Sequence, residues 1–211
     1  MDSSSAGKIL NILKKLYPHP HHYLDFQDPY QLLIATILSA QAPDKTVNAV
    51  TPSLFKKFPT PRHLAGADLS DIEESIRSVN FYRNKSKAIQ GSARLLEEKY
   101  RGRVPDRMED LIKFPGIARK SANVILQQGF NRVEGVVVDT HVIRLSQRLG
   151  WSQNKDPGKI ESDLMGLFDR KDWKWLTFYL KSHGIAVCRA PRPKCGECKL
   201  APTCPSRDKN N

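Results

Sequence analysis

The segment Leu111–His141 reads LIKFPGIARKSANVILQQGFNRVEGVVVDTH, and the rest of the chain is organised around it. Pro115 cannot continue a helical hydrogen-bond ladder and Gly116 tolerates left-handed geometry, so the pair predicts a tight reversal between two short helices. The second helix is expected to begin near Ala118. Its free N–H groups and the positive end of its dipole then form an anion site. The segment therefore predicts a hairpin that holds phosphate.

Lys120 is the candidate nucleophile of this hairpin. It lies in the first turn of the second helix beside Arg119, where the helix dipole and the neighbouring charge both disfavour its protonated form. An amine that gives up its proton can act as a nucleophile. The alternative is a solvated lysine that only contacts phosphate, and the acid described next favours the catalytic interpretation.

Asp139 follows the apolar run Val136–Val138 and precedes a helical pattern that ends at Gly150. Its simplest role is a helix N-cap, which contributes roughly 1 kcal/mol. An ionised aspartate at a helix start can also stabilise a developing cation, so the capping and catalytic interpretations are compatible.

The charge balance of the chain favours a polyanionic partner. The 211 residues carry a formal net charge of +12, with clusters of Lys and Arg at residues 83–103 and from residue 189 onward. A generally basic surface is the alternative, but basic clusters on both sides of a phosphate-holding hairpin favour nucleic acid. No stretch has the length and apolarity of a membrane span, and residues 1–7 are too polar for a secretory signal. We therefore expect the protein to work in the compartment where it is made.

The apolar periodicity along the chain is helical, and no stretch alternates as a strand does. The fold class expected is all-α. Helix starts are predicted at Ser4 or Ser5, at Asp28-Pro29, at Asp44 and at Asp156-Pro157. Two capping boxes are also predicted, Ser70 with Glu73 and Asp106 with Glu109.

Two polar loops carry further candidates. The loop Ser39–Asp44 lies between two apolar helices and can present Gln41 outward, where an amide can replace the hydrogen bonds of a displaced base. The turn Asn80–Asn84 places Phe81 and Tyr82 in a basic setting, where an aromatic side chain either joins the core or intercalates between bases.

All four cysteines fall within 17 residues near the end of the chain, in the spacing C-x6-C-x2-C-x5-C: Cys188, Cys195, Cys198 and Cys204. Without a secretory signal this cluster indicates a metal site instead of disulfides. One central pair flanked by two single cysteines fits a four-iron cluster slightly better than zinc. The short positive loop between the first two cysteines carries Arg192 and Lys194, so the metal is expected to hold a loop that contacts phosphate.

Three features, in this order along the chain, resemble the endonuclease III family of helix-hairpin-helix DNA glycosylases: LSAQAPDKTVN at 38–48, the hairpin FPGIARKSANVIL followed by VVVDTH, and the cysteine tail. The resemblance covers essentially the whole chain. It implies an all-α protein of two lobes with DNA bound in the cleft between them. A six-helix barrel domain would comprise residues 23–134, with the helix-hairpin-helix at 107–127, and an iron-sulfur cluster domain would comprise residues 1–22 and 135–211.

The resemblance also implies an activity, namely excision of oxidised pyrimidines through a lysine Schiff base, followed by β-elimination that cleaves the strand 3′ to the abasic site. The family's nucleophile falls on Lys120, its catalytic aspartate on Asp139, its gap-filling residue on Gln41 and its intercalating wedge on Phe81. Further DNA contacts are expected at Gly116, Ala118, Arg119, His141, Arg192 and Lys194, and the ligands of a [4Fe-4S] cluster at Cys188, Cys195, Cys198 and Cys204.

The implied partner is double-stranded DNA with a damaged base or an abasic site, bound by a monomer. The implied location is the nucleoid of a bacterial or archaeal cytoplasm, in preference to a nucleus. The alternatives are a monofunctional glycosylase for mismatched or alkylated bases, which Lys120 argues against, and a non-catalytic iron-sulfur DNA-binding protein, which Lys120 and Asp139 together argue against. A zinc-bound nucleic-acid module is a third, distinguished by its lack of colour.

Two positions depart from the family pattern. Ala118 stands at the second glycine of the PGVGRK hairpin, where a requirement for positive φ would cost an alanine roughly 1 kcal/mol. Asn80-Phe81-Tyr82 stands where the wedge turn often has Gly-Leu-Tyr, and this difference bears on the preferred base opposite the lesion.

Overall fold

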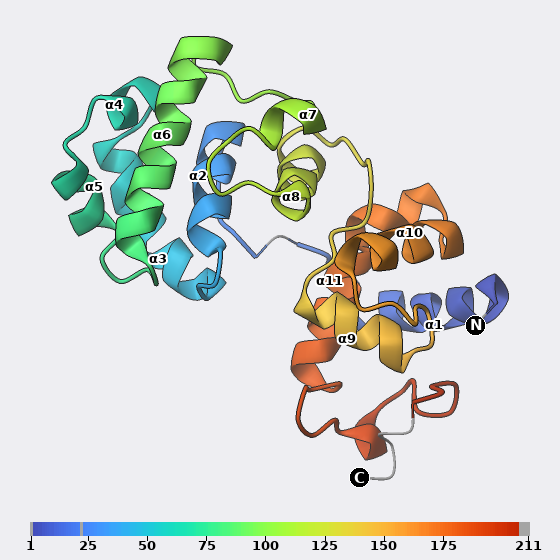
Figure 1. The fold of residues 1–211 in the computed structure, drawn as a ribbon. Coiled ribbons are helices and arrows are strands. Elements are labelled where there is room, and N and C mark those ends of the chain that lie inside the picture. The colour runs from blue at the N-terminus through green and yellow to red at the C-terminus, as the bar shows by residue number, and fades with distance from the viewer. Residues whose placement is uncertain (1, 22, 207–211) are drawn as a thin grey trace. The chain divides into compact units, whose positions relative to one another are not determined.

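The structure is a computed structural model that describes residues 2–21 and 23–206. The expectation of an all-α fold is confirmed, since the described residues form helices and no strands. The chain divides into two compact units, one made of Met1–His21 with Val133–Asn211 and the other of His22–Arg132 (Figure 1). No helix in the described ranges has the length and apolarity needed to cross a bilayer.

The unit His22–Arg132 is built around one buried helix. Its helices are α2 (Pro29–Ser39), α3 (Asp44–Lys57), α4 (Pro61–Ala65), α5 (Leu69–Ser75), α6 (Tyr82–Tyr100), α7 (Met108–Leu111) and α8 (Arg119–Gly129). In Figure 1, α2 lies among α3, α6 and α8, each of which it contacts. Every residue of α2 from Leu32 to Leu38 is buried, so this helix forms the centre of the unit's apolar core.

The start of α2 is set locally by its sequence. Asp28 lies just outside the helix in extended conformation, and its carboxylate accepts a hydrogen bond from the N–H of Gln31 at 2.8 Å. Pro29 follows at the first helical position, where its missing N–H costs nothing. The predicted Asp28-Pro29 start is therefore confirmed.

The second unit packs its helices on α11. It comprises α1 (Ser3–Leu16), α9 (Thr140–Arg148), α10 (Pro157–Leu167), α11 (Arg170–Ala186) and the short 3-10 helix η1 (Cys195–Glu197). Both α1 and α9 contact α11. Lys14 of α1 forms an ion pair with Asp172 of α11 at 2.6 Å. A Cβ at Gly184 would lie 2.7 Å from His141 Nδ1, so α9 and α11 approach each other at a place where only glycine fits.

Several helix starts were predicted one or two residues from where they occur. The first helix is capped by Asp2, not by Ser4 or Ser5, and the cap of α3 is Pro43, with Asp44 inside the helix. The Ser70–Glu73 capping box is wrong, because α5 already begins at Leu69 after Asp68. Asp156-Pro157 is confirmed as the start of α10. Capping side chains occur every few residues in this chain, so local pattern alone does not choose among them.

Candidate active site and DNA interface

The hairpin between α7 and α8 requires glycine at position 116. Gly116 has φ +82°, a conformation that side chains other than glycine rarely adopt. A Cβ there would lie 3.4 Å from Ile37 Cγ2 of α2. Phe114 and Ile117, on either side of the turn, are buried and anchor it in the core. The predicted reversal at Pro115-Gly116 is therefore present, and α2 supports it.

The first turn of α8 is open to solvent. Its N-cap residue, Ala118, makes no side-chain capping hydrogen bond, and Arg119 and Lys120 at the helix start are both exposed. Ala118 has φ −104° and ψ 174°, ordinary extended backbone. The alanine that replaces the family glycine thus carries no conformational cost. The N–H groups and cations that could meet a phosphate share this end of the helix.

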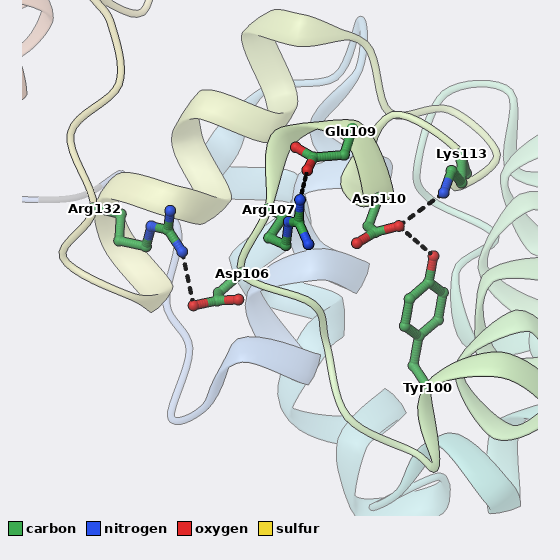
Figure 2. Close-up of polar contacts among 7 residues, drawn as sticks. All are labelled: Tyr100, Asp106, Arg107, Glu109, Asp110, Lys113 and Arg132. Carbon is green, nitrogen blue, oxygen red and sulfur yellow. Dashed lines mark hydrogen bonds and ion pairs between the residues drawn. The ribbon is translucent and has the colours of Figure 1, made fainter.

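Polar contacts hold the entrance to the hairpin (Figure 2). Asp110 accepts hydrogen bonds from Tyr100 Oη at 3.2 Å and Lys113 Nζ at 2.8 Å. The bond from Lys113 is the main reason that the pKa of Asp110 lies below its usual value. Since the ring of Tyr100 also stacks on that of Phe114, α6 is tied to α7 and to the residue just before the turn.

The expected capping box at the start of α7 is wrong. The N-cap is Arg107, with no side-chain capping bond. Asp106 instead pairs with Arg132 at 2.9 Å, and Glu109 pairs with Arg107 (Figure 2). Asp106 and Glu109 pair with arginines because a charged partner competes well with a backbone N–H for an exposed carboxylate.

Gln41 and Phe81, the predicted gap-filling and wedge residues, lie on two loops that meet. Gln41 is exposed with φ +53°, and Phe81 has φ +59° and keeps 61% of its surface exposed. Asn80 Nδ2 donates a hydrogen bond to the backbone oxygen of Gln41 at 3.1 Å. Among the described residues Phe81 is the most exposed large apolar side chain, a position that suits a residue that inserts between bases.

Asp139 is the N-cap of α9, as its position after the valine run predicted. Its carboxylate accepts a hydrogen bond from the N–H of Val142 at 2.9 Å. Val136, Val137 and Val138 are all buried, and Thr177 Oγ1 of α11 donates to the backbone oxygen of Val137 at 2.5 Å. A buried segment thus delivers a half-buried carboxylate in a fixed position.

His141 lies in the first turn of α9 and is half-buried. Its burial lowers its pKa below the ordinary value, as do the charges of Arg144 and Lys181, whereas the charge of Asp139 acts in the opposite sense. Arg144 Nη2 lies 3.2 Å from His141 Nδ1, so this nitrogen accepts and Nε2 carries the proton. With Nδ1 facing Arg144, His141 can donate a hydrogen bond from Nε2 to a phosphate oxygen.

The four cysteines form no disulfide bonds with one another, and all four line one cavity. Burial raises the pKa of the Cys198 thiol, and its neighbours Cys188 and Cys204 raise it further. Apolar side chains, among them Leu145, complete the lining. No group of three or more His, Cys, Asp or Glu side chains in the described ranges has the arrangement of a single-ion site.

Arg148 is a residue that sequence reasoning missed. From the last turn of α9 it donates to the backbone oxygens of Arg189 at 2.7 Å and Ala190 at 3.0 Å, and to Cys188 Sγ at 3.4 Å. Arg144 adds a bond to the Cys188 oxygen at 3.1 Å. The spacing of two arginines one helical turn apart was the only sequence signal. These residues fix the start of the loop on which Arg192 and Lys194 are exposed.

The chain belongs to the HhH-GPD superfamily of base excision DNA repair proteins, whose model matches residues 34–170. Within it, the chain is 54% identical to Endonuclease III of Synechocystis sp. (strain ATCC 27184 / PCC 6803 / Kazusa), over 95% of this chain and 92% of that protein. It is 37% identical to Endonuclease III of Bacillus subtilis (strain 168), over 92% and 89% of the two chains. The resemblance seen in the sequence is confirmed.

Solved structures agree. A trapped Endonuclease III–DNA covalent intermediate has a TM-score of 0.93 with this chain at 36% identity, covering 100% of this chain and 98% of the other. A thermostable thymine-DNA glycosylase reaches a TM-score of 0.85 at 17% identity, with 96% of each chain covered. That second likeness concerns the fold alone.

The loop between Cys188 and Cys195 can be tested for DNA contact by the salt dependence of DNA binding. Each phosphate contact that a cation makes steepens the fall of log K with log salt by about 0.9 for duplex DNA. We expect Arg192→Glu and Lys194→Glu each to lower that slope by about 1 or more for undamaged duplex, measured by fluorescence anisotropy. Lys8→Glu, the same charge change at an exposed position of α1, is the control and should leave the slope near the wild-type value. Slopes unchanged by both loop substitutions would show that this loop does not touch DNA.

Proposed function

We propose that this protein is a bifunctional DNA glycosylase and abasic-site lyase of base excision repair that acts on oxidised pyrimidines. The observation that carries the proposal is the 54% identity to an Endonuclease III across 95% of the chain. The hairpin geometry supports it, because α8 presents an uncapped, cationic first turn to solvent. The relatives are bacterial, and we infer that the protein acts as a monomer on nucleoid DNA in the cytoplasm.

Lys120 supplies the nucleophile. Its Nζ attacks C1′ of the flipped nucleotide, the bond from C1′ to the base breaks, and the base leaves with the bonding electrons. Opening of the sugar ring gives a Schiff base between Nζ and C1′. Loss of a C2′ proton then expels the 3′ phosphate by β-elimination, which cleaves the strand. A relative of 36% identity is known as a trapped covalent intermediate with DNA, which supports this route.

Asp139 stabilises positive charge that develops at the sugar and assists proton transfer. Its backbone is held by the buried valine segment, and its carboxylate is oriented by the N–H of Val142. A carboxylate fixed before the reaction begins needs no reorganisation at the transition state. The remaining contacts to DNA are assigned to Gly116, Ala118, Arg119, His141, Arg192 and Lys194.

Cys188, Cys195, Cys198 and Cys204 are assigned as ligands of a [4Fe-4S] cluster. The donor set fits, because four thiols around one cavity can give one thiolate to each iron. When bound, such a cluster has no open coordination position and supplies a scaffold for its loop. Arg148 approaches Cys188 Sγ at 3.4 Å and His183 Nε2 approaches Cys198 Sγ at 3.5 Å, and N–H groups beside a thiolate offset its charge.

Lys120→Gln tests the nucleophile. Borohydride should no longer trap a covalent adduct with lesion-bearing DNA, because no amine is left to form the imine, whereas affinity for an abasic-site analogue should stay within about threefold. Lys113→Gln is the matched control on the same hairpin. Its pKa is raised by the hydrogen bond to Asp110, so it stays protonated, and the variant should trap normally. Trapping by Lys120→Gln would point to another amine, with the terminal amine and Lys45 next in line.

Asp139→Asn separates charge from capping. Asparagine is a good N-cap, so unfolding should change little, but base release in single-turnover assays should fall by about 100-fold with the carboxylate charge gone. Asp156→Asn, which alters the cap of α10 in the same way, should leave the rate unchanged. Equal rates for wild type and Asp139→Asn would leave Asp139 with the capping role alone.

Cys198→Ser tests the cluster. The variant should lose most of its iron, its yellow-brown colour and much of its soluble yield, because metal binding also stabilises the folded tail. Iron content per chain is the measurement. Ser206→Ala, at another position lining the same cavity, should keep wild-type iron. A colourless Cys198→Ser protein with full yield and activity would contradict the scaffold role.

A further inference from the structure

The two loops that carry Gln41 and Phe81 are joined at the surface by one side chain. The loop after α2 presents Gln41, and the turn before α6 presents Asn80 and Phe81. The only hydrogen bond recorded between the two among the described residues runs from Asn80 Nδ2 to the backbone oxygen of Gln41, at 3.1 Å. It connects positions 39 residues apart in the sequence.

Both loops hold a non-glycine residue in left-handed conformation. Gln41 has φ +53°, and Phe81 has φ +59° and ψ +32°. Such residues keep this conformation only where their surroundings hold them. Asn80 touches the first directly and is the chain neighbour of the second, so its amide couples the two strained positions.

The two helices that carry these loops, α2 and α6, are joined by a buried contact. Lys85 of α6 is 6% exposed, and its Nζ donates to the backbone oxygen of Leu38 at 2.7 Å. This places an ammonium at the negative end of α2. Burial lowers the pKa of the Lys85 ammonium below its usual value. With α2 and α6 locked together below, the alignment of the loop tips depends on Asn80.

We propose that Asn80 is a positioning residue that holds Gln41 and Phe81 as one preformed unit, so that DNA meets a wedge and a gap-filling amide already in register. The inference rests on the proposed function, in which those two side chains enter the duplex. If the two loops are already ordered in the free protein, DNA binding does not have to offset the entropy cost of ordering them. The register also fixes where the Gln41 amide faces the unpaired base, so Asn80 influences discrimination among opposite bases.

The test uses the full-length protein and lesion duplexes with 2-aminopurine opposite the lesion, whose fluorescence rises when that base unstacks. Asn80→Ala should lower both the fluorescence change and the single-turnover rate by about 3- to 10-fold, the range that corresponds to one neutral hydrogen bond. The spread of rates among the four opposite bases should narrow. Thermal stability and affinity for undamaged duplex should not change. Asn84→Ala, which removes another exposed amide four residues along, is the control and should behave as wild type.

A double-mutant cycle distinguishes positioning from a general structural effect. Because Asn80 is proposed to position both Gln41 and Phe81, the effect of Asn80→Ala should shrink in a Gln41→Ala background and largely disappear when Phe81→Ala is added to that background. The same loss in all three backgrounds would overturn the inference, as would wild-type behaviour of Asn80→Ala when Gln41→Ala is impaired. An unimpaired Gln41→Ala would refute the proposed role of Gln41 and this inference with it, while borohydride trapping through Lys120 would still report on the proposed chemistry.

Discussion

The burial of α2 along its length is the constraint on which the unit His22–Arg132 depends. Its residues from Leu32 to Leu38 are closed off from water by α3, α6 and α8. The fit to α8 is close at both ends. A Cβ at Gly129 would lie 3.3 Å from Leu32 Cδ2, and one at Gly116 would lie 3.4 Å from Ile37 Cγ2. Close packing of this kind transmits displacement from one helix to the next, so the hairpin keeps its position only while α2 keeps its own.

The C-terminal end of α2 carries this constraint into the candidate site. Each of its last four carbonyls has a donor: Ser39 Oγ for Thr36, the N–H of Ala40 for Ile37, Lys85 Nζ for Leu38 and the N–H of Ala42 for Ser39. A helix end whose carbonyls are all satisfied does not fray. It therefore gives the Gln41 loop a fixed origin on the helix that also supports Gly116.

The fold and the local conformation around the candidate-site residues could largely be predicted, because the signals for both are local. Asp28 and Asp139 are caps whose partners lie three residues away, and Gly116 is demanded by the conformation of its own turn. In one wrong prediction, a residue distant in the sequence pairs with the side chain that was expected to cap a helix. Asp106 was assigned to a capping box, but Arg132, 26 residues away in the sequence, pairs with it instead.

The residues that position the site could not be predicted from the sequence, because their partners are distant along the chain. Lys85 and Arg148 belong to the residue type that most often lies solvated on a surface, and nothing in their neighbours distinguishes them from other cations of this basic chain. Their roles follow from which carbonyls the fold brings within reach, namely that of Leu38 for Lys85 and those of the cysteine loop for Arg148. The resemblance to a family identifies residues that react, because they recur in a motif. The residues that hold them in place are specified by tertiary contacts, and departures such as Asn80 acquire meaning only when those contacts are known.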